Sequence, residues 1–181
     1  MSAQENKDIG TNYVENVITS PYYFSKNPVR DTEILFKPFF NKVMAAVAEF
    51  NKTHPEQEVF FVETYRSNTL QMIHFQNGAS KIRRNGMHHY SIAVDCAYKI
   101  NGKFTYNGDY RLLRECMKNQ GLSLLGLWDI GHVQGIPVEE QTALREAVDA
   151  AVKKFQKDNG LTPDGAVGPK TIAKAKQVFG K

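Results

Sequence analysis

Residues 86–95, which read GMHHYSIAVD, constrain this chain more than any other segment, because they place two imidazoles and a carboxylate around one short apolar strand. Side chains alternate in character from Ser91 to Tyr98, as expected of a half-buried strand. Asp95 falls on the face that carries the small residues. A carboxylate buried without a partner is strongly unfavourable, so Asp95 needs a cation or hydrogen-bond donors. With His88 or His89 just upstream, the segment suggests half of a metal site.

A third ligand is required, and residues 128–134 supply a candidate in His132, with a second carboxylate, Asp129, three residues earlier. Two histidines, one aspartate and a water form the open coordination expected of catalytic zinc, whereas structural zinc usually has cysteine ligands. Cys96 and Cys116 lack C-x-x-C spacing and are interpreted as small buried residues. The carboxylate of Asp129 would then serve as a base.

The 181 residues suffice for one large domain, or for one of about 130–140 residues with a small appendage. The polar N-terminus lacks the apolar core of a secretory signal, and no apolar run approaches the ~20 residues of a membrane span. We therefore expect a protein that is made in soluble form in the cytoplasm, without stable membrane insertion, and that depends on another factor to leave it.

Positive charge is concentrated at the C-terminal end. The net charge is +4, and residues 151–181 hold seven lysines against two aspartates, so the rest of the chain is slightly acidic. Such a basic segment suggests attraction to an anionic surface such as cell envelope, membrane or nucleic acid. A solvated lysine-rich helix face explains the charge equally well.

The pattern of apolar residues predicts an α+β fold, with a small mixed or antiparallel sheet, flanking helices and a small all-α C-terminal domain. Residues 1–30 are interpreted as an extended segment packed on the body. The predicted elements, in chain order, are a helix over 31–54, a strand over 59–62, a helix over 67–75, a strand over 91–98 that enters a hairpin at Asn101-Gly102, a helix over 110–119, a strand over 122–128, and helices over 142–158 and 169–178.

Taken together, the candidate residues lie at the ends of three predicted strands. Zinc held by His88, Asp95 and His132 would polarise a carbonyl and acidify its bound water. Asp129 would take the proton, and Arg66, which follows the strand over 59–62, would stabilise the developing oxyanion. The predicted chemistry is metal-assisted hydrolysis of an amide.

The pattern Gly86-x-His88-x-x-Ser91-x-Ala93-x-Asp95 resembles the S-x-H-x-x-G-x-A-x-D signature of the zinc D-Ala-D-Ala carboxypeptidase and LD-endopeptidase family. Trp128-Asp129-x-x-His132 is similar to that family's downstream motif. Tyr65-Arg66-Ser67 with Gln71 is similar to its upstream arginine segment. The resemblance covers roughly residues 30–135.

The resemblance implies that His88, rather than His89, joins Asp95 and His132 as a zinc ligand. It implies that Asp129 is the general base and that Arg66 contacts the substrate, with Gln71 as a further substrate contact. Two positions depart from the signature, since Gly86 replaces its serine and Ser91 its glycine. An aspartate as base is more similar to the phage L-alanyl-D-glutamate endopeptidases than to the dipeptidases.

The C-terminal segment carries a second resemblance. Its Phe155-Gln156, Asn159-Gly160-Leu161 and Asp164-Gly165-x-x-Gly168-Pro169-x-Thr171 strings are similar to the peptidoglycan-binding domain of three-helix type. We therefore expect a zinc peptidase domain over residues 1–135 and a helical peptidoglycan-binding domain over 136–181. Tethering a hydrolase to its insoluble substrate raises the local substrate concentration.

These resemblances imply an endolysin-like, monomeric enzyme that cuts the peptidoglycan stem peptide at the L-Ala-D-Glu bond. It would stay in the host cytoplasm until a holin gives access to the cell wall. The alternatives are a D-Ala-D-Ala carboxypeptidase and a non-catalytic wall-binding protein. A nucleic-acid binder is disfavoured, because no groove-reading motif accompanies the lysines. His89 is expected next to the ligands or at the surface, and Trp128 in the core.

Overall fold

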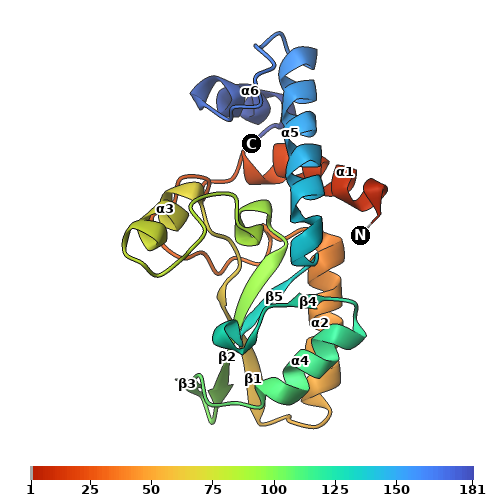
Figure 1. Ribbon diagram of the computed structural model, residues 1–181, viewed down its shortest axis with the longest axis vertical. Coiled ribbons are helices and arrows are strands. Elements are labelled where there is room, and N and C mark those ends of the chain that lie inside the picture. Colours follow the sequence, from red (N-terminus) through yellow and green to blue (C-terminus); the bar gives the residue numbers. More distant parts are fainter. Residues whose placement is uncertain (1) are drawn as a thin grey trace.

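A small antiparallel sheet organises the computed structural model of the protein, which describes residues 2–181 (Figure 1). Within this range the sheet has five strands in the order β1-β2-β5-β4, with β3 paired to β2. The strands are β1 (Gln57–Glu63), β2 (Ala93–Ile100), β3 (Lys103–Thr105), β4 (Ser123–Leu124) and β5 (His132–Gln134). Helices flank the sheet, so the predicted α+β class is confirmed.

Residues 2–181 also form six α-helices, α1 (Ala3–Asn12), α2 (Lys37–Asn51), α3 (Asn68–Gln76), α4 (Tyr110–Asn119), α5 (Gln141–Asp158) and α6 (Pro169–Phe179). Shorter helical turns are η1 (Tyr13–Val17), η2 (Met87–Tyr90), η3 (Leu127–Asp129) and η4 (Val138–Glu140). In Figure 1, α2 and α4 lie beside the sheet, and α5 leads away from it to α6. The predicted hairpin is confirmed, with φ of 52° at Asn101 and 74° at Gly102.

Two predicted elements differ most in extent. The helix expected from residue 31 begins at Lys37, because Pro38 fits only the first turn, where its missing N–H is not needed. The strand expected over 122–128 is limited to Ser123–Leu124, since its partner β5 is three residues long. The chain then turns through η3, and His132 lies within β5 rather than after a strand end.

The prediction of an extended segment over residues 1–30 is wrong for its first half, which forms α1 and η1. Ser2 and Glu5 make a reciprocal capping box that satisfies free N–H groups at the start of α1. The helix packs along α5, and a Cβ at Gly10 would lie 3.0 Å from Ala151 Cβ and 3.1 Å from the Ala147 carbonyl oxygen. Gly10 therefore allows a close approach of two helices from opposite ends of the chain.

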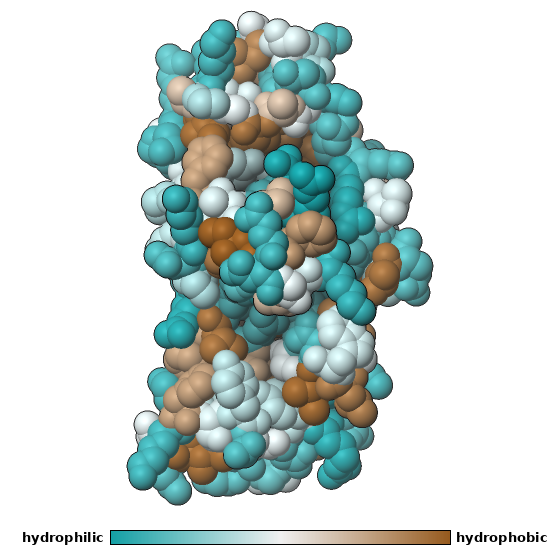
Figure 2. Space-filling model, turned by 60° about the vertical axis from the view of Figure 1, so that its left-hand side comes forward, coloured by the Kyte–Doolittle hydropathy of each residue, from teal (hydrophilic) through white to brown (hydrophobic). Residues whose placement is uncertain are grey.

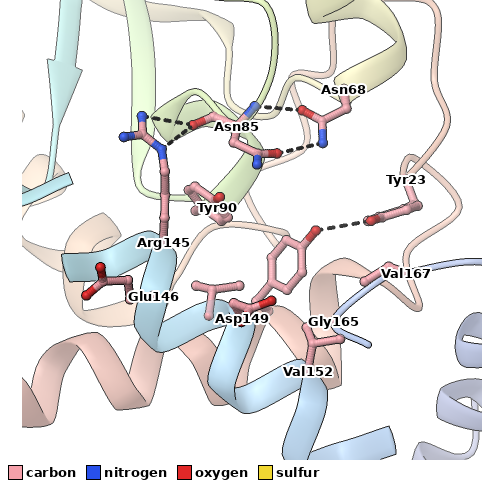
Figure 3. Close-up of a pocket in the computed structure, with 12 residues that line it drawn as sticks. Tyr23, Asn68, Asn85, Tyr90, Arg145, Glu146, Asp149, Val152, Gly165 and Val167 are labelled. Atoms are coloured by element: carbon pink, nitrogen blue, oxygen red, sulfur yellow. Dashed lines mark hydrogen bonds between the residues drawn. The ribbon is translucent and has the colours of Figure 1, made fainter. Parts of the chain in front are cut away.

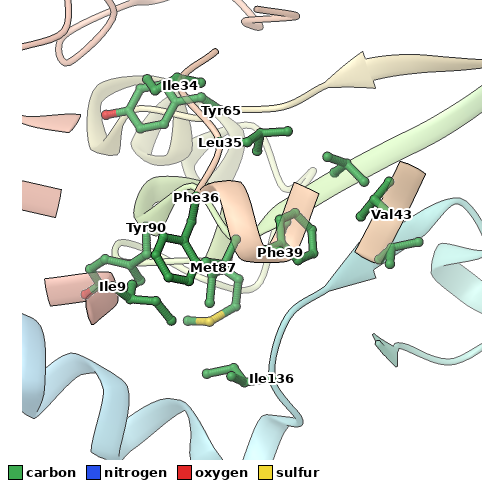
Figure 4. Packing of buried hydrophobic residues seen from close by; sticks show 14 of the residues in the cluster. Ile9, Ile34, Leu35, Phe36, Phe39, Val43, Tyr65, Met87, Tyr90 and Ile136 are labelled. Carbon is green, nitrogen blue, oxygen red and sulfur yellow. The ribbon is translucent and has the colours of Figure 1, made fainter. Parts of the chain in front are cut away.

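One hydrophobic core runs through the sheet, the N-terminal helix and α5 (Figure 4). Ile9 of α1 lies near Tyr90, Phe36 and Met87, and Ile136 follows β5 into the same cluster. Buried residues of α5 and α6, including Leu144, Val148, Val152, Phe155 and Ala175, belong to it too. Residues on both sides of the domain boundary predicted at residue 136 thus share one core. The division into two domains stays a prediction.

Exposed apolar residues form separate spots on the face shown in Figure 2, which is otherwise mostly hydrophilic. None of the helices in residues 2–181 is long and apolar enough to span a membrane.

His89 links the N-terminal segment to the body and is fully buried rather than at the surface. Its Nε2 lies 2.8 Å from the Tyr13 hydroxyl and 3.1 Å from Asn68 Nδ2, and its Nδ1 lies 3.4 Å from the Tyr65 hydroxyl. Burial lowers the pKa of His89 from 6.5 to about 4, so the ring is neutral in the folded protein near pH 7.

Acid is therefore expected to destabilise the fold through His89. As the pH falls from 6.5 to about 4, His89 becomes protonated in the unfolded chain but stays neutral in the folded protein. The free energy of unfolding should fall over that window by ~3 kcal/mol from this group alone. In the variant His89→Gln, whose side chain stays neutral, the free energy of unfolding should fall by ~3 kcal/mol less than in the parent between pH 7 and pH 4. Urea denaturation at both pH values measures this, and equal losses in both proteins would contradict the assignment.

Candidate metal centre and active-site cleft

Strand pairing places Asp95 between acidic and imidazole side chains. On β5, His132 is the register partner of Asp95, and on β1 the partner is Glu63. A bulge between Phe61 and Glu63 sets the second pairing, and bulges commonly re-aim side chains next to active sites. The β5 contact depends on Gly131, whose carbonyl oxygen accepts from the Cys96 N–H at 2.9 Å and whose backbone lies so close to β2 that a Cβ would lie 2.5 Å from the Cys96 carbonyl oxygen.

His88 reaches the same point from η2, just before β2. The turn ends at Ser91, which adopts left-handed backbone angles with φ of 59° and ψ of 32°. Glycine adopts this conformation without strain, so the serine found here costs ~1 kcal/mol. Its hydroxyl is buried without a hydrogen-bond partner in the described structure. Ser91 therefore keeps the turn that glycine would form. Its hydroxyl does not replace the one that is absent at Gly86.

Three donor atoms converge, as the sequence predicted. His88 Nε2 lies 3.2 Å from Asp95 Oδ1, His132 Nδ1 lies 2.9 Å from the same oxygen, and the two nitrogens are 3.3 Å apart. Tetrahedral zinc with bonds of about 2.0–2.1 Å separates its ligand atoms by roughly 3.3 Å. The three side chains therefore fit a divalent metal with one open position, and His89 is not among them.

The charges of the three side chains are coupled. Burial raises the pKa of Asp95, but the two imidazoles outweigh it and hold that pKa well below its usual value. Burial lowers the pKa of His132, but the hydrogen bond and charge of Asp95 outweigh it, so the net shift is upward. A metal ion would take the place of the proton that these shifts favour, so protons and metal compete for the site.

Arg66 follows β1 and is held by acidic and amide oxygens. Its Nε donates to Glu63 Oε2 at 2.8 Å and its Nη2 donates to the same oxygen. Nη2 also lies 3.4 Å from Asp95 Oδ2, and Nη1 donates to Gln71 Oε1 at 3.3 Å. Glu63, which sequence reasoning did not single out, thus orients the arginine, and its place at the end of β1 was the available signal.

Gln71 lies behind Arg66 and is buried. Its Nε2 donates to Ser80 Oγ at 2.9 Å and to the Ile82 carbonyl at 2.7 Å, while its Oε1 accepts from Arg66. The amide is therefore occupied in joining Arg66 to the 80–82 loop. Its predicted role as a substrate contact stays a prediction.

Asp129 and Trp128 lie along a cleft of about 540 Å³ whose lining includes Glu63, Arg66 and Asp95. Burial raises the pKa of Asp129, Asp95 adds to the rise, and His132 opposes it. A carboxylate with a raised pKa suits a proton-transfer role. The expectation that Trp128 lies in the core is wrong, since its side chain is 80% exposed at the cleft rim.

Gln134 is a further residue that the motifs did not reveal. Its Nε2 donates to the Ile136 carbonyl at 2.6 Å, so its Oε1 faces His132 Nε2 at 3.1 Å. His132 therefore carries a proton on Nε2, which leaves the Nδ1 lone pair toward Asp95 and His88. The spacing of two residues on one strand, which places both side chains on one face, could have indicated this contact.

Residues 122–174 match the model of a family described as a peptidoglycan binding domain. The match includes β4, β5, α5 and the first part of α6, and supports peptidoglycan as a partner of this chain. It begins within the sheet, before the boundary predicted at residue 136. No curated protein matches the chain.

Loss of the Gln134 acceptor should weaken metal binding. The variant Gln134→Leu leaves His132 Nε2 without an acceptor, so zinc affinity should fall by about 10–100-fold. Gln134→Glu keeps an acceptor oxygen and should retain most of the affinity. Competition with a chromogenic chelator measures both values.

The matched control is Gln156→Leu, because Gln156 is equally buried but holds the 164–166 loop of the C-terminal segment. It should leave zinc affinity within about twofold of the parent. Equal losses in the Gln134→Leu and Gln156→Leu variants would reject a specific role for Gln134.

Proposed function

We propose that this protein is a zinc-dependent peptidase that cuts the stem peptide of peptidoglycan, at the L-Ala-D-Glu bond. The observation that carries the proposal is the convergence of His88, Asp95 and His132 beside a cleft that Asp95 lines together with Asp129 and Arg66. The match to a peptidoglycan binding domain supports the substrate polymer. The sequence resemblance to the zinc endopeptidases supports the reaction and the bond.

Zinc, when bound by the three side chains, would polarise the scissile carbonyl and lower the pKa of a bound water. Asp129 then accepts the proton of the attacking water and transfers it to the leaving nitrogen. Arg66, fixed by Glu63 and Gln71, binds the substrate and stabilises the negative charge that develops on the carbonyl oxygen. Gln134 keeps His132 in the tautomer that presents Nδ1.

The rim of the cleft suits a polymer rather than a small molecule. Trp128 and Tyr106, with 80% and 61% exposure, stand at the rim and offer apolar faces to an extended ligand. The C-terminal helices, matched to a wall-binding family, would hold the enzyme on an insoluble substrate between cuts.

Metal binding and proton transfer can be separated by mutation. Asp129→Ala should reduce lysis of purified sacculi by at least about 100-fold while zinc remains bound, because Asp129 is not among the ligands. His132→Ala should lose both zinc and activity. Turbidity loss and metal analysis of the purified variants give the two readouts.

Asp8→Ala, a change at an exposed position of α1, is the control and should behave as the parent protein. Near-normal lysis by Asp129→Ala would contradict the proposed role of Asp129 in proton transfer. If the parent protein kept its activity after the metal was removed by a chelator, the proposed metal requirement would be wrong.

Fragment masses decide which bond is cut. Cleavage at L-Ala-D-Glu should release stem peptides that have lost their first alanine and should expose new glutamate amines. Loss of a single terminal alanine would instead identify a D-Ala-D-Ala carboxypeptidase. Binding to sacculi with no released fragment would indicate a wall-binding protein without catalysis.

A further inference from the structure

A second cavity, of about 440 Å³, lies where α5 meets the N-terminal segment and the start of α3 (Figure 3). The wall from α5 and the following loop includes Arg145, Glu146, Asp149 and Val167. The opposite wall consists of Tyr13, Tyr23, Asn68, Asn85 and Tyr90. Only the first wall lies within residues 122–174, which match the peptidoglycan-binding family, so the cavity forms where this match packs against other parts of the chain.

Hydrogen bonds fix the second wall before any ligand arrives. Asn68 Nδ2 donates to Asn85 Oδ1 at 2.8 Å, and the Asn85 N–H donates to Asn68 Oδ1 at 2.8 Å. The Tyr13 and Tyr23 hydroxyls lie 3.1 Å apart. Asn85 adopts a left-handed φ of 58°, which the paired amide holds in place. A rigid polar wall costs little ordering entropy when a ligand binds.

Arg145 provides a cation at the edge of this wall. Its Nε and Nη2 each lie 3.3 Å from the Asn85 carbonyl oxygen, and Nη2 donates to Gln141 Oε1 at 3.0 Å. Both acceptors are neutral, so these contacts orient the guanidinium without cancelling its charge. The fork is half-buried beside Tyr90, where a carboxylate would be bound more tightly than in open water.

The α5 wall also carries the opposite charge. Glu146 and Asp149 are exposed and line the cavity, and Asp149 lies 2.7 Å from Lys153 Nζ. A cavity with a cation, two carboxylates, amides and tyrosines suits a peptide that has charged groups and backbone amides. A sugar chain with neutral hydroxyl and acetamide groups offers no charged group to pair with Arg145.

We propose that this cavity binds a stem-peptide segment of the wall polymer, with a peptide carboxylate on Arg145 and its amides on Asn68 and Asn85. The volume lies in the range of ligand sites, and a short peptide of two or three residues fills it. The assignment rests on peptidoglycan as partner, as in the proposed function, but does not require the cutting step. The cavity between α5 and the N-terminal segment would then contact the cell wall, in addition to the C-terminal helices.

Binding of the full-length protein to purified sacculi tests this directly. Sedimentation is carried out with a chelator present, so that no variant can cut the polymer. Arg145→Met should weaken binding by at least about tenfold, and Arg145→Lys, which keeps the charge but not the fork, by less. Arg111→Met removes the same charge from an exposed position of α4 and should match the parent. Val167→Trp, which fills the cavity, should weaken binding without changing any charge.

Sacculi stripped of stem peptides by an amidase provide the second arm, and binding to them should fall to the level of Arg145→Met. Undiminished binding to stripped glycan would overturn the peptide assignment in favour of a sugar ligand. Parent-like binding by both Arg145→Met and Val167→Trp would overturn the cavity as a site. Circular dichroism melts show that each variant is folded. Hydrolysis of a short soluble peptide by the zinc-loaded parent protein is measured separately, so a failure of the catalytic proposal is seen independently.

Discussion

The position of Asp95 in the middle of the sheet is the constraint on which the candidate site depends. One neighbouring strand brings Glu63 opposite it and the other brings His132, so a like charge and an imidazole flank the same carboxylate. Arg66 bridges the two acids, which turns an unfavourable pair into a network. A shift of β1, β2 or β5 by one residue would turn its side chains to the opposite face of the sheet, and these contacts would be lost.

Local sequence was a good guide wherever chemistry and periodicity coincided. His88, Asp95 and His132 could be chosen because their motifs resemble those of a zinc-peptidase family, and the hairpin at Asn101-Gly102 could be chosen from turn preference. The α+β class followed from the alternation of strand and helix patterns. These features need little knowledge of how distant segments meet.

What sequence missed depends on tertiary packing. The α1 helix reads as polar until Gly10 meets Ala147 and Ala151, so its apolar face is visible only in the fold. Trp128 reads as a core residue, yet the shortness of β4 and β5 leaves it at the rim. Gln134 and Glu63 have no motif of their own, since their importance lies in the atoms they face.

The close contact of α1 with α5 also bears on how the protein is made. Because Gly10 packs against Ala147 and Ala151, which come much later in the chain, α1 gains this native partner only after α5 has been synthesised. Tyr13, directly after α1, contacts His89, which is next to a candidate metal ligand. The α1–α5 contact therefore links the packing around His89 to a part of the chain that is made much later.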